Sequence, residues 1–252
     1  MSDKIALIDA DSLLYYEMGK STLEEAIEGI DTRIEQILNF AGTTNYIGFL
    51  TLGRCFRYDI AKTKPYKYNR KGKMSKPPIF YALKEYVQQK WHFKAVKELE
   101  ADDLMAIYQN MYDDTVICSP DKDVLKQLVG RHFNYGKMEY IETTDDEANK
   151  FLLMQALMGD STDGIPGIPK VGPKTAEKWV NDNPTITMVL EKYHETFGIQ
   201  EGILKFAETF NLVYLIRTVE EMLLLGYTVD LTDISVNSST TKKIEKDDSE
   251  WN

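Results

Sequence analysis

Short apolar runs alternate with longer amphipathic stretches through the first half of the chain. Short runs predict strands, and apolar residues at three- and four-residue spacing predict helices with one buried face. The expected strands are 4–8, 46–52, 93–97 and 115–118, and the expected helices are 22–41, 79–91, 101–112, 122–129 and 145–158. Alternation of this kind builds βαβ units, so we expect an α/β fold with a mostly parallel central sheet flanked by helices.

The composition of the sequence changes at Gly159. Four glycines and three prolines fall within 159–173, and further helices are expected at 174–182, 185–196 and 200–216. This change predicts a second, helical unit, so we place the domain boundaries at 1–156 and 157–232. From 233 to 252 the chain is rich in Ser, Thr, Lys and Asp, and we expect a flexible acidic tail.

Bulk properties narrow the class of protein. The 252 residues, 43% hydrophobic and 28% charged, are typical of a globular protein. Two distant cysteines, Cys55 and Cys118, are too few for a disulfide framework, and Asp9 and Asp11 interrupt the apolar N-terminal stretch. No uninterrupted run of 18 apolar residues occurs. We therefore expect a soluble, cytoplasmic protein without membrane contact.

Charge is segregated along the chain. The net charge is −10, which by itself argues against a nucleic-acid partner. However, 60–84 contains eight Lys or Arg residues and no acidic residue. This run overlaps the stretch 53–78, which has no sustained apolar face, and we interpret that stretch as a basic loop or partly helical arch over the surface.

Acidic residues gather where strands end and helices begin. Asp9 follows the first expected strand, and Asp121 and Asp123 follow the fourth. Because the carboxyl ends of parallel strands converge on one crevice, we expect these side chains to meet there. Other acids open the helix at 101 or lie in the Gly/Pro-rich loop. The full candidate set is Asp9, Glu100, Asp102, Asp103, Asp121, Asp123, Asp160 and Asp163.

Each of these acids alone has an ordinary explanation as a helix cap or turn former. Together, at least six carboxylates from four segments would converge with no evident cationic residue beside them, and such a cluster needs a bound cation. Three scattered histidines and no paired thiols accompany them, so hard ions fit better than zinc. We expect two Mg²⁺ ions, which Mn²⁺ can replace, arranged for in-line attack on a phosphodiester.

The loop and helix start at 164–178, GIPGIPKVGPKTAEK, have the composition of a phosphate-binding segment. Glycines let backbone N–H groups approach an anion, and a helix N-terminus and lysines favour the same charge. Lys170, Lys174 and Lys178 are the side-chain candidates. Taken singly, these glycines and prolines are also consistent with ordinary loop structure.

Four motifs in this order resemble the 5′-nuclease superfamily, which includes bacteriophage 5′–3′ exonucleases, flap endonucleases and the 5′-nuclease domain of bacterial DNA polymerase I. They are LIDAD at 7–11, ELEADDLMA at 98–106, SPDKDVLKQL at 119–128 and LMGDSTDGIPGIPKVGPKTA at 157–176. The resemblance covers most of 4–182. It implies a PIN-like sheet, a helix-three-turn-helix in the C-terminal helical region, and a metal-dependent 5′–3′ exonuclease or flap endonuclease that hydrolyses DNA.

The resemblance also implies roles for the acidic residues. Asp9, Glu100, Asp102 and Asp121 match the ligands of a first metal ion. Asp123, Asp160 and Asp163 match the residues that hold or orient a second. Asp103 matches a neighbouring acidic position whose role in the family is less certain.

The basic stretch PYKYNRKGK at 65–73 resembles the arch of the family. By resemblance, Tyr66 stacks on an unpaired base, while Lys67 and Arg70 contact the scissile phosphate as catalytic residues. A solvated lysine-rich loop is the alternative. The helix-three-turn-helix grips the duplex backbone and often holds K⁺. The positions implied to bind DNA are Tyr66, Lys67, Arg70, Lys71, Gly167, Lys170, Gly172, Lys174, Thr175 and Lys178.

One position departs from the family pattern. The family usually has another metal-binding Asp at the end of the second strand, where this chain has Leu50 or Leu52, with Asp59 further along. Two alternatives to the nuclease therefore stay open: a noncatalytic or weakly catalytic DNA-structure-binding protein, and a PIN-type ribonuclease. The expected partner is duplex, nicked or 5′-flap DNA, or an RNA–DNA hybrid, bound by a monomer. The sequence identifies no replication-protein partner.

Overall fold

The computed structural model describes residues 4–70, 76–180 and 184–239. The strands are β1 (Ile5–Asp9), β2 (Asn45–Phe49), β3 (Thr115–Cys118), β4 (Gly130–Asn134), β5 (Glu139–Thr143), β6 (Gly159–Asp160), β7 (Ile165–Pro166) and β8 (Asn237–Ser238). The helices are α1 (Ala10–Glu17), α2 (Leu23–Ala41), α3 (Arg57–Ile60), α4 (Pro78–Lys90), α5 (Ala101–Met111), α6 (Lys122–Gln127), α7 (Asp145–Met158), α8 (Pro173–Trp179), α9 (Ile186–Phe197), α10 (Ile199–Val213) and α11 (Val219–Leu224), with a 3₁₀ turn, η1 (Tyr68–Arg70).

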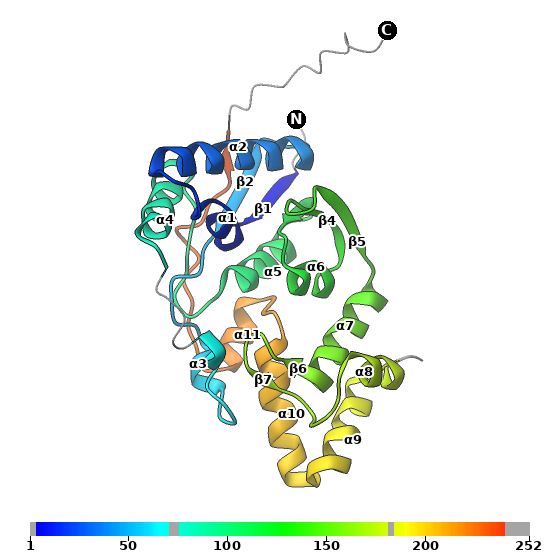
Figure 1. The fold of residues 1–252 in the computed structure, drawn as a ribbon. Coiled ribbons are helices and arrows are strands. Elements are labelled where there is room, and N and C mark those ends of the chain that lie inside the picture. Colours follow the sequence, from blue (N-terminus) through cyan, green and yellow to red (C-terminus); the bar gives the residue numbers. More distant parts are fainter. Residues whose placement is uncertain (1–3, 71–75, 181–183, 240–252) are drawn as a thin grey trace.

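A six-stranded sheet with the order β5-β4-β3-β1-β2-β8 forms the upper part of the molecule (Figure 1). β1 is parallel to both β2 and β3, and β3 is parallel to β4. The two edges are antiparallel, because β5 pairs with β4 and β8 pairs with β2. All five residues of β1 are buried, as expected for a central strand covered on both faces. The expectation of a mostly parallel α/β sheet is confirmed.

Two apolar cores cover the two faces of this sheet. One contains residues of α1, α2 and α4, with Ile30 and Leu83 fully buried. The other contains residues of α5, α6 and the segment around α11, with Leu104 and Met222 fully buried. Alternate residues of β1 point into opposite cores, Ile8 into the first and Leu7 into the second. The carboxyl end of β1, where Asp9 lies, is therefore supported by packing on both faces of the sheet.

The helices α7 to α10 form the lower part of the molecule in Figure 1. A third core joins α7, α8, α9 and the loop before α8, and contains Leu153, Ile168 and Tyr193. The expected domain boundary at 156 falls inside α7, which runs without interruption to Met158. α7 buries residues in two cores, Leu153 in the third and Leu152 in a fourth, so the same helix packs against α6 as well as against α9 and α10.

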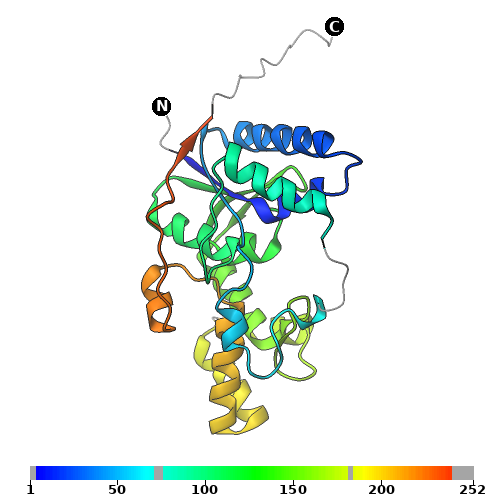
Figure 2. The same cartoon turned by 90° about the vertical axis from the view of Figure 1, so that its left-hand side faces the viewer.

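The structure corrects several expected strands. The segment 93–97 forms only a bridge between Lys94 and Phe49 at the end of β2, where Lys94 exchanges backbone hydrogen bonds with Gly48 and Leu50. β4 and β5 were not expected, because their polar and apolar residues mix as at a half-exposed sheet edge. The expected tail begins with structure, since β8 pairs with β2 (Figure 2). Residues 240–252 lie outside the described part of the chain.

The basic stretch 53–78 is partly ordered secondary structure. It contains α3 and η1, and its Tyr66 side chain is buried in a fourth apolar cluster with Cys55 and Leu212. The described part of this stretch is thus partly helical, while 71–75 lie outside the described residues. In the described ranges, no helix has both the length and the apolar character to cross a membrane.

Candidate active site

Two aspartates lie at the carboxyl ends of neighbouring parallel strands. Asp9 ends β1 and caps α1 by accepting a hydrogen bond from the Ser12 backbone N–H at 3.1 Å. Asp121 follows β3 and caps α6, with its Oδ1 atom 2.7 Å from the Asp123 backbone N–H. The caps that explain these residues individually also fix where their carboxylates lie. Both therefore lie at the crevice edge that strand order predicts.

A second pair of acids begins α5. Glu100 is the N-cap residue and Asp102 lies in the first turn. The Thr51 hydroxyl accepts a hydrogen bond of 3.1 Å from the Ala101 backbone N–H, which ties this helix start to the end of β2. Negative charge is favoured at a helix N-terminus, so the helix helps to tolerate these acids beside the strand ends.

Asp160 and Asp163 are placed by the tight antiparallel pairing of two short strands. β6 and β7 pair so closely that a Cβ added to Gly159 would lie 2.2 Å from the Ile165 carbonyl oxygen, and Gly159 has a φ of 69°. Asp160 then accepts backbone hydrogen bonds from Thr162 at 2.6 Å and Asp163 at 3.3 Å. Glycine is required here by both conformation and space.

The carboxylates repel one another across a small pocket of about 50 Å³, whose lining includes Glu100, Asp102, Asp123, Asp160 and Asp163. Burial is the largest cause that raises the pKa of Asp102 well above its ordinary value, and the charges of Asp121 and Asp9 raise it further. Burial, then Asp121, raises the pKa of Asp123 to about 7, and burial, then Asp11, raises that of Asp9 to about 6. This pattern marks a site for positive charge.

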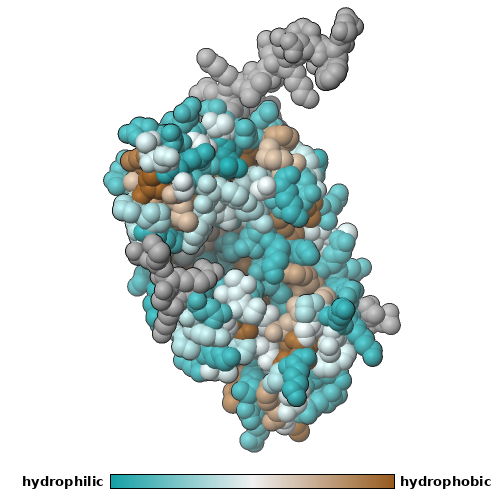
Figure 3. Space-filling model, viewed as in Figure 1, coloured by the Kyte–Doolittle hydropathy of each residue, from teal (hydrophilic) through white to brown (hydrophobic). Residues whose placement is uncertain are grey.

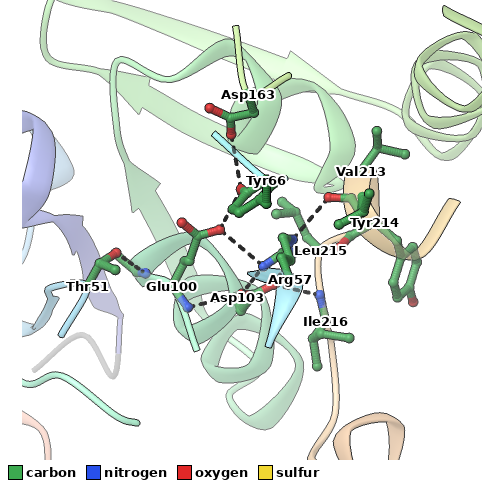
Figure 4. Close-up of polar contacts among 12 residues, drawn as sticks. Thr51, Arg57, Tyr66, Glu100, Asp103, Asp163, Val213, Tyr214, Leu215 and Ile216 are labelled. Atoms are coloured by element: carbon green, nitrogen blue, oxygen red, sulfur yellow. Dashed lines mark hydrogen bonds and ion pairs between the residues drawn. The ribbon is translucent and has the colours of Figure 1, made fainter. Parts of the chain in front are cut away.

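Arg57 lies beside these acids, contrary to the expectation that no cation accompanies them (Figure 4). It is buried and makes a two-pronged pair with Asp103, at 2.6 Å from Nη1 to Oδ2 and 2.7 Å from Nη2 to Oδ1. It also donates to the backbone carbonyls of Leu212 and Tyr214, at the end of α10. Asp103 further accepts from the Ile216 backbone N–H at 3.0 Å. Both Asp103 oxygens therefore have protein partners, and Asp103 ties Arg57 and the segment after α10 to the start of α5.

Lys67 and Tyr66 also face the acids. The Lys67 ammonium pairs with Glu100 and lies 3.6 Å from Asp163 Oδ2. The Tyr66 hydroxyl donates to Glu100 at 2.8 Å and to Asp163 at 3.0 Å. Burial alone would raise the pKa of Glu100, but Lys67 and Arg57 hold it at about 2. Tyr66 is only 4% exposed and its ring packs edge-on against another tyrosine, so the expected stacking on an unpaired base does not fit its position.

Polar residues that the sequence did not single out support the acids. Gln155 of α7 donates to Asp123 at 3.0 Å, and Gln127 of α6 donates in turn to Gln155 at 2.7 Å. Ser119 is fully buried and donates to Asp9 at 2.8 Å. Glutamines within amphipathic helices carry no local sequence signal, so only the tertiary packing of α6 on α7 reveals them.

The two leucines expected at the position of the missing aspartate have different surroundings. Leu50 is fully buried in a core and Leu52 is 55% exposed, and neither side chain has an oxygen to offer a metal ion. The Thr51 backbone N–H donates to Asp11 at 3.1 Å. Asp59 instead pairs with Arg54 on the surface, so it does not replace the missing ligand.

Several of the carboxylates already have hydrogen-bond partners within the protein. Within the described ranges, no group of three His, Cys, Asp or Glu side chains is arranged to hold a metal ion directly. Asp9, Glu100 and Asp163 each have side-chain donors from the protein instead. The donor set is all oxygen and therefore suits a hard cation, but these side chains would need to turn from their present partners to bind one.

The expected DNA-binding positions form two groups. Lys67 and the backbone of Arg70 lie at the arch base, while the side chain of Arg70 and all of Lys71 lie outside the described part. The other group surrounds α8, where Lys170, Lys174 and Lys178 are exposed. It also includes Gly167, Gly172 and Thr175. The face drawn in Figure 3 is recessed at mid-height, and its surface there is mostly hydrophilic.

The fold and site define a class of protein: a parallel α/β sheet with an acidic crevice, joined to a helical unit with a glycine-rich loop. A sequence model of the family "5′-3′ exonuclease, C-terminal SAM fold" matches residues 147–242. A DNA polymerase I of Rhizobium leguminosarum is 32% identical over 108 residues, which are 38% of this chain and 11% of the polymerase. A 5′-3′ exonuclease of Buchnera aphidicola (Acyrthosiphon pisum) is 32% identical over 182 residues, 65% of this chain and 60% of the relative.

Among solved structures, the flap endonuclease of bacteriophage T5 in a complex with DNA and metal ions has the same fold, with a TM-score of 0.66 and 17% identity. The match covers 88% of this chain and 93% of that one. The chain spans less than two thirds of the length of the two sequence relatives. The family model and the sequence relatives agree with the resemblance to the 5′-nuclease superfamily, and the T5 structure shares the fold.

Proposed function

We propose that this chain is a metal-dependent 5′-nuclease that hydrolyses phosphodiesters of DNA near 5′ ends, in duplex, nicked or flapped substrates. The observation that carries the proposal is the set of mutually repelling carboxylates at the carboxyl edge of the parallel sheet, with the Lys67 ammonium among them. The names of the sequence relatives and the DNA and metal ions in the T5 structure support it.

The carboxylates fit divalent cations by their chemistry. Burial and mutual repulsion keep the pKa values of Asp102 and Asp123 high, and a cation would remove that penalty. Asp9, Glu100, Asp102 and Asp121 would hold a first ion, and Asp123, Asp160 and Asp163 would hold or orient a second. When bound, Mg²⁺ or Mn²⁺ would help to deprotonate water and neutralise charge on the phosphate.

Lys67 would stabilise negative charge on the scissile phosphate. Its backbone has a φ of 55°, and its N–H donates to the Asp163 carbonyl at 2.7 Å, which fixes the residue at the rim of the acidic pocket. Its ammonium can therefore move from Glu100 to a phosphate without displacement of the backbone. A cation placed in advance where charge develops lowers the barrier of such reactions. By resemblance, Arg70 would assist it.

The loop before α8 and the helix itself would grip the duplex backbone. Lys170, Lys174 and Lys178 supply charge, and Gly172 and Thr175 supply close backbone approach at the helix N-terminus. Contacts of this kind read no base sequence. We therefore propose that the chain selects DNA by its structure and acts as a monomer. By resemblance, K⁺ would bind at the helix-three-turn-helix. RNA–DNA hybrids would also be accepted.

The test is cleavage of a 5′-flap duplex, labelled at either end, with Mg²⁺, Mn²⁺ or chelator. Asp121→Asn with Asp123→Asn keeps the helix cap and should lower cleavage at least 1,000-fold, while duplex binding in chelator stays within about two-fold. Asp145→Asn with Asp146→Asn, two exposed acids at the start of α7, is the matched control and should cut normally.

The outcomes separate the proposal from its alternative. Loss of cutting in the first variant alone supports a nuclease, and product lengths distinguish terminal trimming from cutting at the junction. Tight flap binding with no cutting under either metal would contradict the nuclease. It would favour a DNA-structure-binding protein, the alternative suggested by Leu50 or Leu52 at the position of the missing ligand.

A further inference from the structure

A hollow of about 600 Å³ lies beside the acidic pocket, between the base of the arch, the glycine-rich loop and the helices α9 and α10. Its size is in the range of small-ligand sites. Ile165 borders both the hollow and the acidic pocket, so the Asp160–Asp163 loop separates the two. Of the positions proposed to grip duplex DNA, only Gly167 and Lys170 border the hollow, which is therefore largely distinct from the grip on α8.

Tyr68 offers an aromatic ring at the wall of this hollow. The side chain is 40% exposed, and one side of the ring packs against Gly164, where an added Cβ would lie 2.5 Å from the ring. The Lys64 ammonium lies 5.7 Å from the ring centroid. The Asn69 side chain donates to the Ser161 carbonyl, which fastens the turn that carries Tyr68 to the acidic loop. The ring is thus positioned by its neighbours and is accessible to a ligand.

The charge around the hollow is of one sign. Lys64, Lys170 and Lys205 border it, and no Asp or Glu among the described residues does. The Lys205 ammonium lies 5.2 Å from the Phe197 ring centroid and 3.4 Å from Glu201, a surface pair that costs little to break. Glu208 nearby accepts from Lys62 and Thr63 backbone N–H groups, so it is already occupied. Such a basic, partly apolar hollow favours an anion with an aromatic part.

We propose that this hollow is a nucleotide-binding subsite, in which Tyr68 stacks on a nucleobase and the three lysines hold a phosphate. Base stacking on an accessible tyrosine and charge attraction to lysine tolerate any base, as a sequence-independent protein requires. The subsite extends the proposed function to a nucleotide next to the one at the acidic pocket. Its ligand is either a nucleotide within the DNA strand or a free nucleoside 5′-monophosphate. Binding there does not use the carboxylates.

The test measures binding in chelator, so that no cleavage occurs. The two probes are dAMP, followed by ligand-observed NMR, and a fluorescein-labelled 5′-phosphorylated hairpin duplex, followed by anisotropy at increasing KCl. Tyr68→Ala should weaken binding of at least one probe roughly ten-fold, and Tyr68→Phe should restore it. Lys205→Ala should weaken the same probe and, for DNA, lower the slope of log Kd against log salt by about one.

Lys192→Ala is the matched control for Lys205→Ala. Lys192 also pairs with a glutamate on its own helix, at 2.8 Å from Glu195, and its ammonium also lies over an aromatic ring, but it does not border the hollow. Weakening of dAMP binding would identify a mononucleotide site, and weakening of DNA binding alone would identify a subsite for the strand. Equal binding by Tyr68→Ala, Lys205→Ala and Lys192→Ala, with melting temperatures unchanged, would overturn the proposal.

The subsite and the nuclease fail independently. The variant Asp121→Asn with Asp123→Asn should keep Tyr68-dependent binding, because neither aspartate borders the hollow. A protein that binds nucleotides through Tyr68 but never cuts DNA would refute the nuclease and leave the subsite standing. A protein that cuts DNA but whose binding is insensitive to Tyr68→Ala would refute the subsite and leave the nuclease standing.

Discussion

Asp102 illustrates how the requirements of a site oppose stability at a single residue. Its own burial and then the charges of the neighbouring acids raise its pKa, so the folded chain disfavours its ionised form. Glu100, two residues earlier, has the opposite environment, because Lys67 and Arg57 hold its pKa at about 2. The fold thus neutralises one acid with its own cations and leaves the other for a cation from outside.

The substitution Asp102→Asn should stabilise the protein in chelator while abolishing cleavage. A raised folded-state pKa means that stability is full below the ordinary value of 3.8 and is lost as pH rises. Asparagine does not ionise, so the variant should melt about 2–4 °C above the parent at pH 8 and with almost no difference at pH 4. Differential scanning calorimetry at both pH values checks this. A variant that melts below the parent at pH 8 would contradict the assigned electrostatics.

At the scale of single elements, the sequence predicted more of the helices than of the sheet. The helices at 101–111 and 145–158 match their expected ranges almost residue for residue, because both begin with a capping box. The β4–β5 hairpin was not predicted, because its burial does not alternate regularly: His132 and Phe133 are buried while Arg131 and Glu142 are exposed. Edge strands depend on their neighbours, which a single sequence does not show.

The candidate site was likewise predicted only in part. Spacing and resemblance identified the acids, but not Arg57, which sits in a short helix without a motif and meets Asp103 46 residues later. The burial of Tyr66 was equally hidden, because it depends on packing against Leu212 of α10. What could not be predicted in each case was a contact between segments far apart in the chain.

The β6–β7 pair should not tolerate a side chain at Gly159. Gly159→Ala would place a Cβ 2.2 Å from the Ile165 carbonyl at a φ of 69°, so we expect a loss of about 2 kcal/mol or more in the free energy of unfolding. Gly19→Ala, where no atom lies within 4 Å, is the control and should stay within about 0.5 kcal/mol of the parent. Urea denaturation compares them. Equal stabilities of the two variants would show that the loop adjusts to the added Cβ, and that the β6–β7 pairing does not fix the position of Asp160.

For the whole molecule, α7 makes the sheet and the helical unit interdependent. Its Gln155 reaches Asp123 at the strand edge, and its Leu153 lies in the core of the helical unit. We therefore expect one cooperative unfolding transition. Tryptophan fluorescence tests this with two single-tryptophan variants, one keeping Trp91 beside the sheet and one keeping Trp179 in α8. Midpoints that coincide are expected, whereas an earlier midpoint for Trp179 would mean that the two parts unfold separately.

The pairing of β8 with β2 has a consequence for biosynthesis. The partner of Asn45 and Tyr46 on this edge is more than 190 residues further along the chain, with the whole helical unit in between. During translation the first strands emerge early, and Lys94 can cover the end of β2, yet the edge at Asn45 and Tyr46 stays uncovered until residues 237 and 238 leave the ribosome. An uncovered edge strand invites pairing with other chains. The interval in which a nascent copy is vulnerable to aggregation is therefore set by the time needed to synthesise the helical unit.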